Sequence, residues 1–370
     1  MQDQDKQHSG PGRNLALYLA TALGYKTLLK LLLERMDEVD EKLSVKIQAT
    51  VDAAFEGKLQ NQVSAAVELK IETELSVLHL ATVLGNIDAA KLLIDKGADI
   101  NAICQVRLED GLQANLSPLM LAAMWKHDGM VQLLLEKGAK VSQTGQARIE
   151  RTFDTAMATP HLSAMLGHEG VKRILKKADS MEARIEAELT GLHLAVLLDD
   201  VAVVSRFLEH GADPDMRCQA DVELKHRDDL NANFQMQLMP LHLAAWAGHE
   251  SVAALLVKSG AEVDAKIQAG GTAALEFGMR IDQKMKPGGT ALHVAVGLGK
   301  EKVARVLIEN GADVGAKTRD GRTAVQWAHG HDGECIRNSG IERSLESVSK
   351  DMKTGFVQKL RRVFQPKNGS

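Results

Sequence analysis

The stretch Pro240-Leu241-His242-Leu243-Ala244-Ala245 decides the fold of this 370-residue chain, because close variants of it recur along the sequence. Copies of its central Leu-His-Leu-Ala motif begin at residues 78, 119, 161, 192, 241 and 292. Each copy is followed by an apolar helical stretch, and five of the six are then followed by a Gly-Ala pair. Self-similarity at this scale predicts an elongated array of repeats.

The copy from Ser76 to Ala102 shows what one unit builds. Ser76 is a suitable N-cap for a short first helix that carries Leu78 and Leu80 on one face. A second helix has apolar residues at helical spacing and stops at Gly97, since glycine readily adopts the left-handed conformation that ends a helix. One helix pair cannot bury its own apolar face, so neighbouring units are expected to stack.

The copies at 240–264 and 290–316 closely resemble the ankyrin repeat, from the Leu-His motif to the closing Gly-Ala turn. Degenerate copies begin at Leu17 and at Thr323. The resemblance implies pairs of antiparallel helices stacked into a curved solenoid that binds proteins, and the family pattern contains no catalytic residue. We therefore expect a mostly α protein: an ankyrin-repeat solenoid over 14–341, with about seven to eight repeats and extended β-hairpin insertions between them.

Insertions lengthen most junctions between copies. Equivalent positions lie 61, 41, 41, 32, 49, 51 and 33 residues apart, whereas the usual period is about 33. The inserted segments alternate apolar and polar residues around turn sequences, as in 45–49, 103–106, 216–220, 234–238, 265–269 and 277–281. Such alternation predicts two-stranded hairpins, which could line up as one continuous ribbon. Two alternatives stay open: the hairpins only pack on one another, or, as we favour, they form one wall of a binding trough.

Two positions of each first helix, just before the Gly-His pair, are expected to face the concave groove of the solenoid. In seven copies these fourteen positions contain no charged or amide side chain. An exposed apolar strip of that length needs a cover, which is either the chain's own hairpins or a protein partner. Tryptophan is enriched in binding hot spots, so Trp125 and Trp246 are candidate anchors. The candidate partner-binding residues are Leu84, Met124, Trp125, Met165, Leu166, Leu197, Leu198, Trp246 and Leu298.

Composition excludes several classes of function. The net charge of −4 is too small and of the wrong sign for a nucleic-acid-binding surface. Three cysteines without a CxxC pair favour a reducing compartment, and the polar N-terminus lacks a signal-type apolar segment, so a cytoplasmic location is expected. Most histidines occupy the repeat motif, and no His, Cys or Asp spacing matches a metal site. We expect no metal, no cofactor and no enzyme activity.

The two ends of the chain differ from the array. Residues 1–13 are predicted to be a flexible N-terminal segment. Residues 342–370 form an amphipathic pattern with a basic second face, which predicts a capping helix and tail. The helix either covers the last repeat or binds an anionic membrane surface or a partner helix, and the cap is the favoured alternative.

These observations together predict a non-catalytic module that binds a protein partner in its concave groove. One concrete form is an inhibitor or immunity-type protein that caps an enzyme or toxin. The alternatives are an assembly scaffold, or a membrane-surface adaptor that acts through the basic C-terminal helix.

Overall fold

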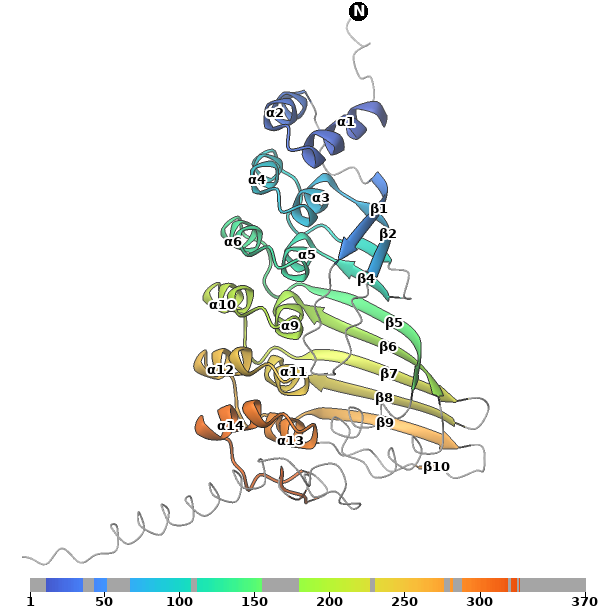
Figure 1. Ribbon diagram of the computed structural model, residues 1–370, viewed down its shortest axis with the longest axis vertical. Coiled ribbons are helices and arrows are strands. Elements are labelled where there is room, and N and C mark those ends of the chain that lie inside the picture. The colour runs from blue at the N-terminus through green and yellow to red at the C-terminus, as the bar shows by residue number, and fades with distance from the viewer. Residues whose placement is uncertain are drawn as a thin grey trace, which may run out of the picture.

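The computed structural model shows helix pairs stacked along one side of the molecule and a large β-sheet along the other (Figure 1). The structure describes residues 11–35, 43–51, 67–107, 112–154, 180–226, 230–275, 280–281, 288–318, 321–324 and 326. The predicted C-terminal helix at 342–370 lies outside these residues. Helix α1 begins at Pro11, three residues before the predicted start of the solenoid.

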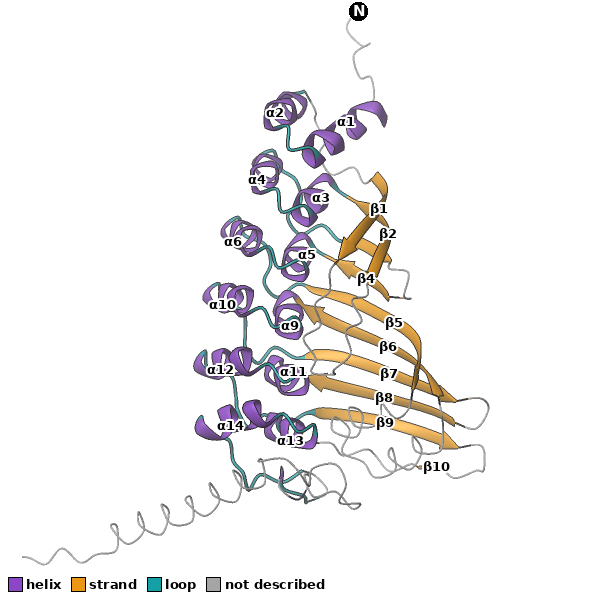
Figure 2. Cartoon of the chain, in the orientation of Figure 1, coloured by secondary structure: helices purple, strands orange, loops and turns teal. Residues whose placement is uncertain are grey.

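Within the described residues, six helix pairs form the stack. In each pair a first helix lies next to the sheet and a second helix lies outside it (Figure 2). The pairs are α1 (Pro11–Ala22) with α2 (Lys26–Glu34), α3 (Val77–Val83) with α4 (Ile87–Asp95), α5 (Pro118–Met124) with α6 (Asp128–Glu136), α9 (Gly191–Leu197) with α10 (Val201–Glu209), α11 (Pro240–Ala247) with α12 (Glu250–Lys258), and α13 (Ala291–Gly297) with α14 (Glu301–Glu309). The predicted ankyrin-type stacking of helix pairs is confirmed.

Two of the described helix pairs contact each other directly although one predicted repeat lies between them in the sequence. The copy that begins at His161 lies outside the described residues, but its neighbours are described. Helix α5 packs directly on α9, and α6 packs directly on α10. Among the described residues, the pair α5 and α6 is therefore followed directly in the stack by the pair α9 and α10, and strands β5 and β6 pair with each other between them in the chain.

The inserted segments form one antiparallel sheet in which ten strands follow one another in chain order. The strands are β1 (Leu43–Val51), β2 (Val67–Leu75), β3 (Cys104–Arg107), β4 (Leu112–Leu116), β5 (Thr144–Asp154), β6 (Ser180–Thr190), β7 (Cys218–His226), β8 (Leu230–Leu238), β9 (Gln268–Leu275) and β10 (Arg280–Ile281). The expectation of a continuous ribbon of hairpins is confirmed. The sequence analysis missed β5 and β6, which pair along all eleven residues of each strand.

Strict alternation gives the sheet one apolar and one polar face. In β7, for example, Cys218, Ala220, Val222 and Leu224 are buried, while the intervening residues are polar and more exposed. On β3 and β4 the apolar residues pack with Met120 and Leu121 of α5 in one core cluster. In this part of the molecule, the apolar face of the sheet therefore lies against the first helices, and the polar face points away from them.

A close backbone approach fixes the start of β5. A Cβ atom on Gly145 would overlap the carbonyl oxygen of Asn115 on β4 and would lie 2.8 Å from Met120 Cε. We expect Gly145→Ala to destabilise the protein by about 3 kcal/mol, since backbone atoms of a paired strand cannot move aside easily. Urea unfolding followed by circular dichroism measures this loss.

Gly129 in α6 provides the matched control. A Cβ atom there would lie 2.9 Å from Ile87 Cδ1, the far end of a flexible side chain. We expect Gly129→Ala to change stability by less than about 1 kcal/mol, because the better helix propensity of alanine offsets a small rearrangement of Ile87. Equal losses in the two variants would contradict the close contact at Gly145.

Candidate protein-binding surface

In four of the described repeats, the motif histidine fixes the start of the first helix and so the position of the inner surface there. His79 Nδ1 lies 2.7 Å from Ser76 Oγ and accepts from the Ser76 backbone N–H at 3.3 Å. Its Nε2 lies 3.0 Å from the carbonyl oxygen of Ala102, at the end of the same repeat. Because Nδ1 accepts, Nε2 carries the proton and donates to that carbonyl. His193, His242 and His293 make equivalent contacts.

Burial keeps two of these rings neutral. Desolvation lowers the pKa of His193 to about 4, and the hydrogen bond to the Met216 carbonyl opposes this only in part. Desolvation also lowers the pKa of His242 to about 4. A neutral, fully hydrogen-bonded ring is a structural element of the repeat, because it satisfies backbone groups at the start and at the end of the same unit.

The candidate strip residues of the middle repeats are partly covered by the chain itself. Met124 and Trp125 pack against the cluster that contains Cys104 and Val106 of the sheet. Leu197, Trp246 and Leu298 pack against the main helical core. All of these residues, and Leu198, keep only an intermediate exposure. Met165 and Leu166 lie outside the described residues.

The strip is open at its N-terminal end. Leu84 is 48% exposed, and Leu23, at the equivalent position of the first repeat, is 62% exposed. Leu15 and Leu19 of α1 are also about half exposed, as are Leu28 and Leu31 of α2. Leu15, Leu19, Leu28 and Leu31 were not among the predicted strip residues, although their spacing places an apolar row on α1 and on α2. The structure therefore divides the predicted strip into an open N-terminal part and a partly covered middle part.

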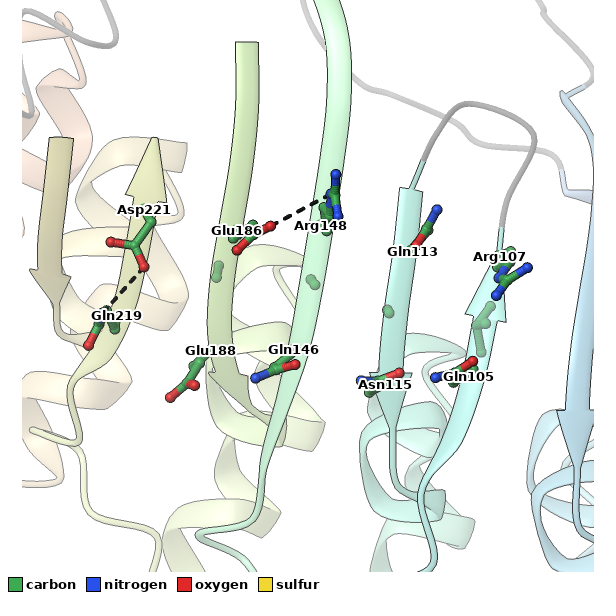
Figure 3. A pocket seen from close by; sticks show the side chains of 14 residues that line it. Gln105, Arg107, Gln113, Asn115, Gln146, Arg148, Glu186, Glu188, Gln219 and Asp221 are labelled. Atoms are coloured by element: carbon green, nitrogen blue, oxygen red, sulfur yellow. Dashed lines mark hydrogen bonds and ion pairs between the residues drawn. The ribbon is translucent and has the colours of Figure 1, made fainter. Parts of the chain in front are cut away.

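A second feature, which the sequence analysis missed, is a cavity of about 310 Å³ on the polar face of the sheet. It crosses strands β3 to β7 where β4 and β5 pair over only three residues (Figure 3). Polar side chains from all five strands point into it: Gln105, Arg107, Gln113, Asn115, Gln146, Arg148, Glu186, Glu188, Gln219 and Asp221. The alternation of the strands places these residues on one face, but not in a hollow.

Arginine and glutamate form a network at one rim of this cavity. Arg148 contacts Glu150, and its Nε lies 3.6 Å from Glu186 Oε1. Arg184 lies 2.6 Å from Glu186 and 3.5 Å from Glu150. The pKa of Glu150 is lowered, first by its hydrogen bond with Arg148. The side chains are about half exposed, so the network orients the guanidinium groups more than it stabilises the fold.

The described part of the chain also shows whether metal ligands, reactive cysteines or membrane-spanning helices are present there. It contains no group of three His, Cys, Asp or Glu residues arranged to hold a metal ion. Cys104 and Cys218 are buried and form no disulfide within the described residues, and burial raises the pKa of the Cys218 thiol to about 11, so this thiol is unreactive at neutral pH. None of the described helices is long and apolar enough to cross a membrane.

Comparisons with known proteins agree with the repeat geometry. Models of ankyrin repeats match residues 2–145 and 160–267, and a further ankyrin-repeat model matches residues 292–337. Among solved structures, the human ASB11 ankyrin repeat domain is 18% identical with a TM-score of 0.47, covering 90% of this chain and 96% of its own. The ankyrin repeat domain of Bcl-3, a member of the IkappaB family, is 18% identical with a TM-score of 0.47, covering 94% and 100%. No curated protein matches the sequence.

Proposed function

The chain belongs to the ankyrin-repeat family, and we propose that it binds a protein partner on its inner surface without catalysing a reaction. Here the inner surface means the first helices of the repeats together with the apolar face of the sheet beside them. Ankyrin repeats are generally protein–protein interaction modules. The observation that carries the proposal is the row of exposed leucines at the N-terminal end of this surface, Leu23 and Leu84 above all.

The energetics favour a partner at this end. Exposed leucines at neighbouring repeats bury apolar area on contact, at about 25 cal/mol for each Å² removed from water. Trp125 lies further along the same surface and is already held by the sheet, so a partner would meet it in a fixed orientation. A surface held in place by stacked helices and a hydrogen-bonded sheet loses little conformational entropy on binding. The partner therefore meets a preformed site.

The finer form of the proposal is an inhibitor or immunity-type protein that caps the active face of an enzyme or toxin. A long surface that is apolar on one side suits such a cap. An assembly scaffold is the second form, and a membrane-surface adaptor acting through residues 342–370 is the third. We also propose a cytoplasmic location, which is supported by two buried cysteines that form no disulfide within the described residues.

Charge placed at the open end tests the proposal. We expect Leu84→Glu to lower recovery of the partner at least about tenfold in affinity capture from the native cell, because a buried unpaired charge opposes the contact. Val201→Glu is the matched control, since Val201 is a similarly exposed apolar residue on the outer helix α10. Quantitative mass spectrometry of the captured proteins gives the readout.

Tryptophan variants extend the test along the strip. We expect Trp125→Ala and Trp246→Ala to weaken capture as well, and thermal unfolding separates lost contacts from lost stability. The same proteins captured at undiminished yield by all three variants would refute the inner surface as the binding site.

The three forms are distinguished by the captured partner. Loss of its enzyme activity at equimolar addition indicates the cap, and simultaneous capture of two partners indicates the scaffold. Removal of residues 344–370 with loss of binding to phosphatidylserine vesicles, but intact capture, indicates the adaptor.

A further inference from the structure

We propose that the cavity on the polar face of the sheet is a second binding site, which takes a lysine or arginine side chain of an extended polypeptide. Cavities of roughly 300 Å³ and above are the usual size for small ligands, so this one fits a side chain and its flanking peptide groups. It lies on the face opposite to the first helices (Figure 3). Binding here is therefore independent of the inner surface.

Carboxylates outnumber the cations at one end of the cavity. Glu186 lies opposite Asp221 in the register of β6 and β7, and Glu188 lies opposite Gln219. Two guanidinium groups, Arg148 in the cavity lining and Arg184 outside it, are both shared between Glu150 and Glu186. Glu188 makes no ion pair or side-chain hydrogen bond within the described residues. This end of the cavity therefore has an unmatched negative charge that attracts a cation.

Asp221 adds an independent indication of a missing donor. Its Oδ2 accepts from Gln219 Nε2 at 3.3 Å, whereas its Oδ1 is shielded from solvent and has no hydrogen-bond partner in the structure. A buried acceptor without a donor costs free energy, so such atoms in native proteins usually have a partner. An ammonium or guanidinium group in the cavity supplies the donor and the charge together.

The cation is organic and not a metal ion. A divalent metal needs several oxygen ligands within about 2–2.6 Å of one point. In the described parts of the chain, no three acidic, histidine or cysteine side chains come together in that way. A guanidinium or ammonium group instead makes separate hydrogen bonds to carboxylates on different strands.

Amide groups along the cavity indicate a polypeptide as the carrier of the cation. The side chains of Gln113, Asn115 and Gln146 make no hydrogen bond to other described residues, and they point into the cavity (Figure 3). Each amide both donates and accepts, which matches the alternating N–H and C=O groups of an extended backbone. Arg107 lies at the opposite end of the cavity, where its charge suits an acidic group of the same segment.

A short peptide tests the site directly. The probe is acetyl-Gly-Ser-Arg-Ser-Gly-amide, titrated into the full chain while the side-chain amide resonances of Gln146 and Gln219 are followed by NMR. We expect saturable shifts at millimolar peptide, and binding at least about fivefold weaker when citrulline replaces arginine, since citrulline lacks the charge. Spermidine serves as a third ligand, because it carries the charge without a peptide backbone.

Isosteric variants complete the test. Glu188→Gln and Asp221→Asn are expected to weaken binding of the arginine peptide about fivefold each, with unchanged thermal unfolding. Glu182→Gln is the matched control, because Glu182 lies on the same strand and face but outside the cavity. The proposal is overturned by absent shifts, by equal binding of the citrulline peptide, by spermidine binding without peptide binding, or by equal weakening in the control.

Discussion

Lowering the pH from 7 to 5 is expected to decrease the free energy of unfolding by about 4 kcal/mol through His193 and His242 alone. The pKa of each ring is lowered to about 4 in the folded protein, from an ordinary value of 6.5. Between these values the unfolded chain binds more protons than the folded one, so stability rises with pH. The contribution is complete above pH 6.5 and is lost as the pH falls toward 4, by about 2 kcal/mol per ring at pH 5.

Urea unfolding at pH 7, 6 and 5 measures this effect. Most carboxylates remain ionised in that range, so the histidines dominate the slope. We expect the double variant His193→Gln, His242→Gln to be less stable at pH 7, but to lose most of the pH dependence. His210→Gln is the control, because His210 lies at the end of α10 outside the motif, where its Nδ1 forms a hydrogen bond with the Arg206 carbonyl. If the stability of the double variant depends on pH as steeply as that of the native protein, His193 and His242 do not cause the pH dependence.

At low pH, the repeats that contain His193 and His242 should open before the whole protein unfolds. His193 closes its repeat through the Met216 carbonyl, and His242 does the same through the Ala265 carbonyl. In a repeat array each unit is held mainly by its neighbours, so adjacent weakened units open together. Hydrogen exchange at pH 5 should therefore increase first in α9 to α12.

The helical half of the fold could be predicted from the sequence, because each helix boundary has a local signal. Ser76 and Asn86 accept hydrogen bonds from the N-terminal turns of α3 and α4. Gly97 then takes a φ of +101° where α4 ends. Such signals act over three or four residues, so they remain readable without any knowledge of the neighbours.

The sheet was predictable only in part. Strand β6 alternates without interruption from Met181 to Leu189, which is a clear period-two pattern. It was missed because the motif-like copy at His161 suggested a further helix pair in that interval. The alternation of apolar and polar residues was the signal that could have identified this strand.

The openness of the candidate strip could not be read from the sequence. Leu84 and Trp125 occupy equivalent positions of consecutive repeats, yet Leu84 is 48% exposed whereas Trp125 is only partly exposed. The difference arises from long-range packing of the sheet cluster around Cys104 onto α5. The cavity on the polar face has the same origin, since it depends on how far β4 and β5 remain paired.

The repeat of α9 and α10 differs from the others at two packed positions, where it has a smaller residue at one and a larger residue at the other. Gly191 occupies the position that holds Val77, Pro118, Pro240 and Ala291 elsewhere. Phe207 occupies the position of Leu93, Leu134, Leu256 and Leu307, all of which are fully buried. A Cβ atom on Gly191 would overlap the Phe207 ring, with 2.8 Å to Cε1. The larger ring is therefore accommodated by the missing side chain.

A double-mutant cycle tests this pairing. We expect Gly191→Ala to cost about 3 kcal/mol, because the buried ring has no free space to move into. Phe207→Leu alone should cost about 1–2 kcal/mol, since it leaves a gap beside Gly191. Combined, the two changes reproduce the Ala291 and Leu307 pair of the last repeat, and the double variant should lie within about 1 kcal/mol of the native protein. Urea unfolding gives the four free energies, and additive losses would show that the two positions do not compensate each other.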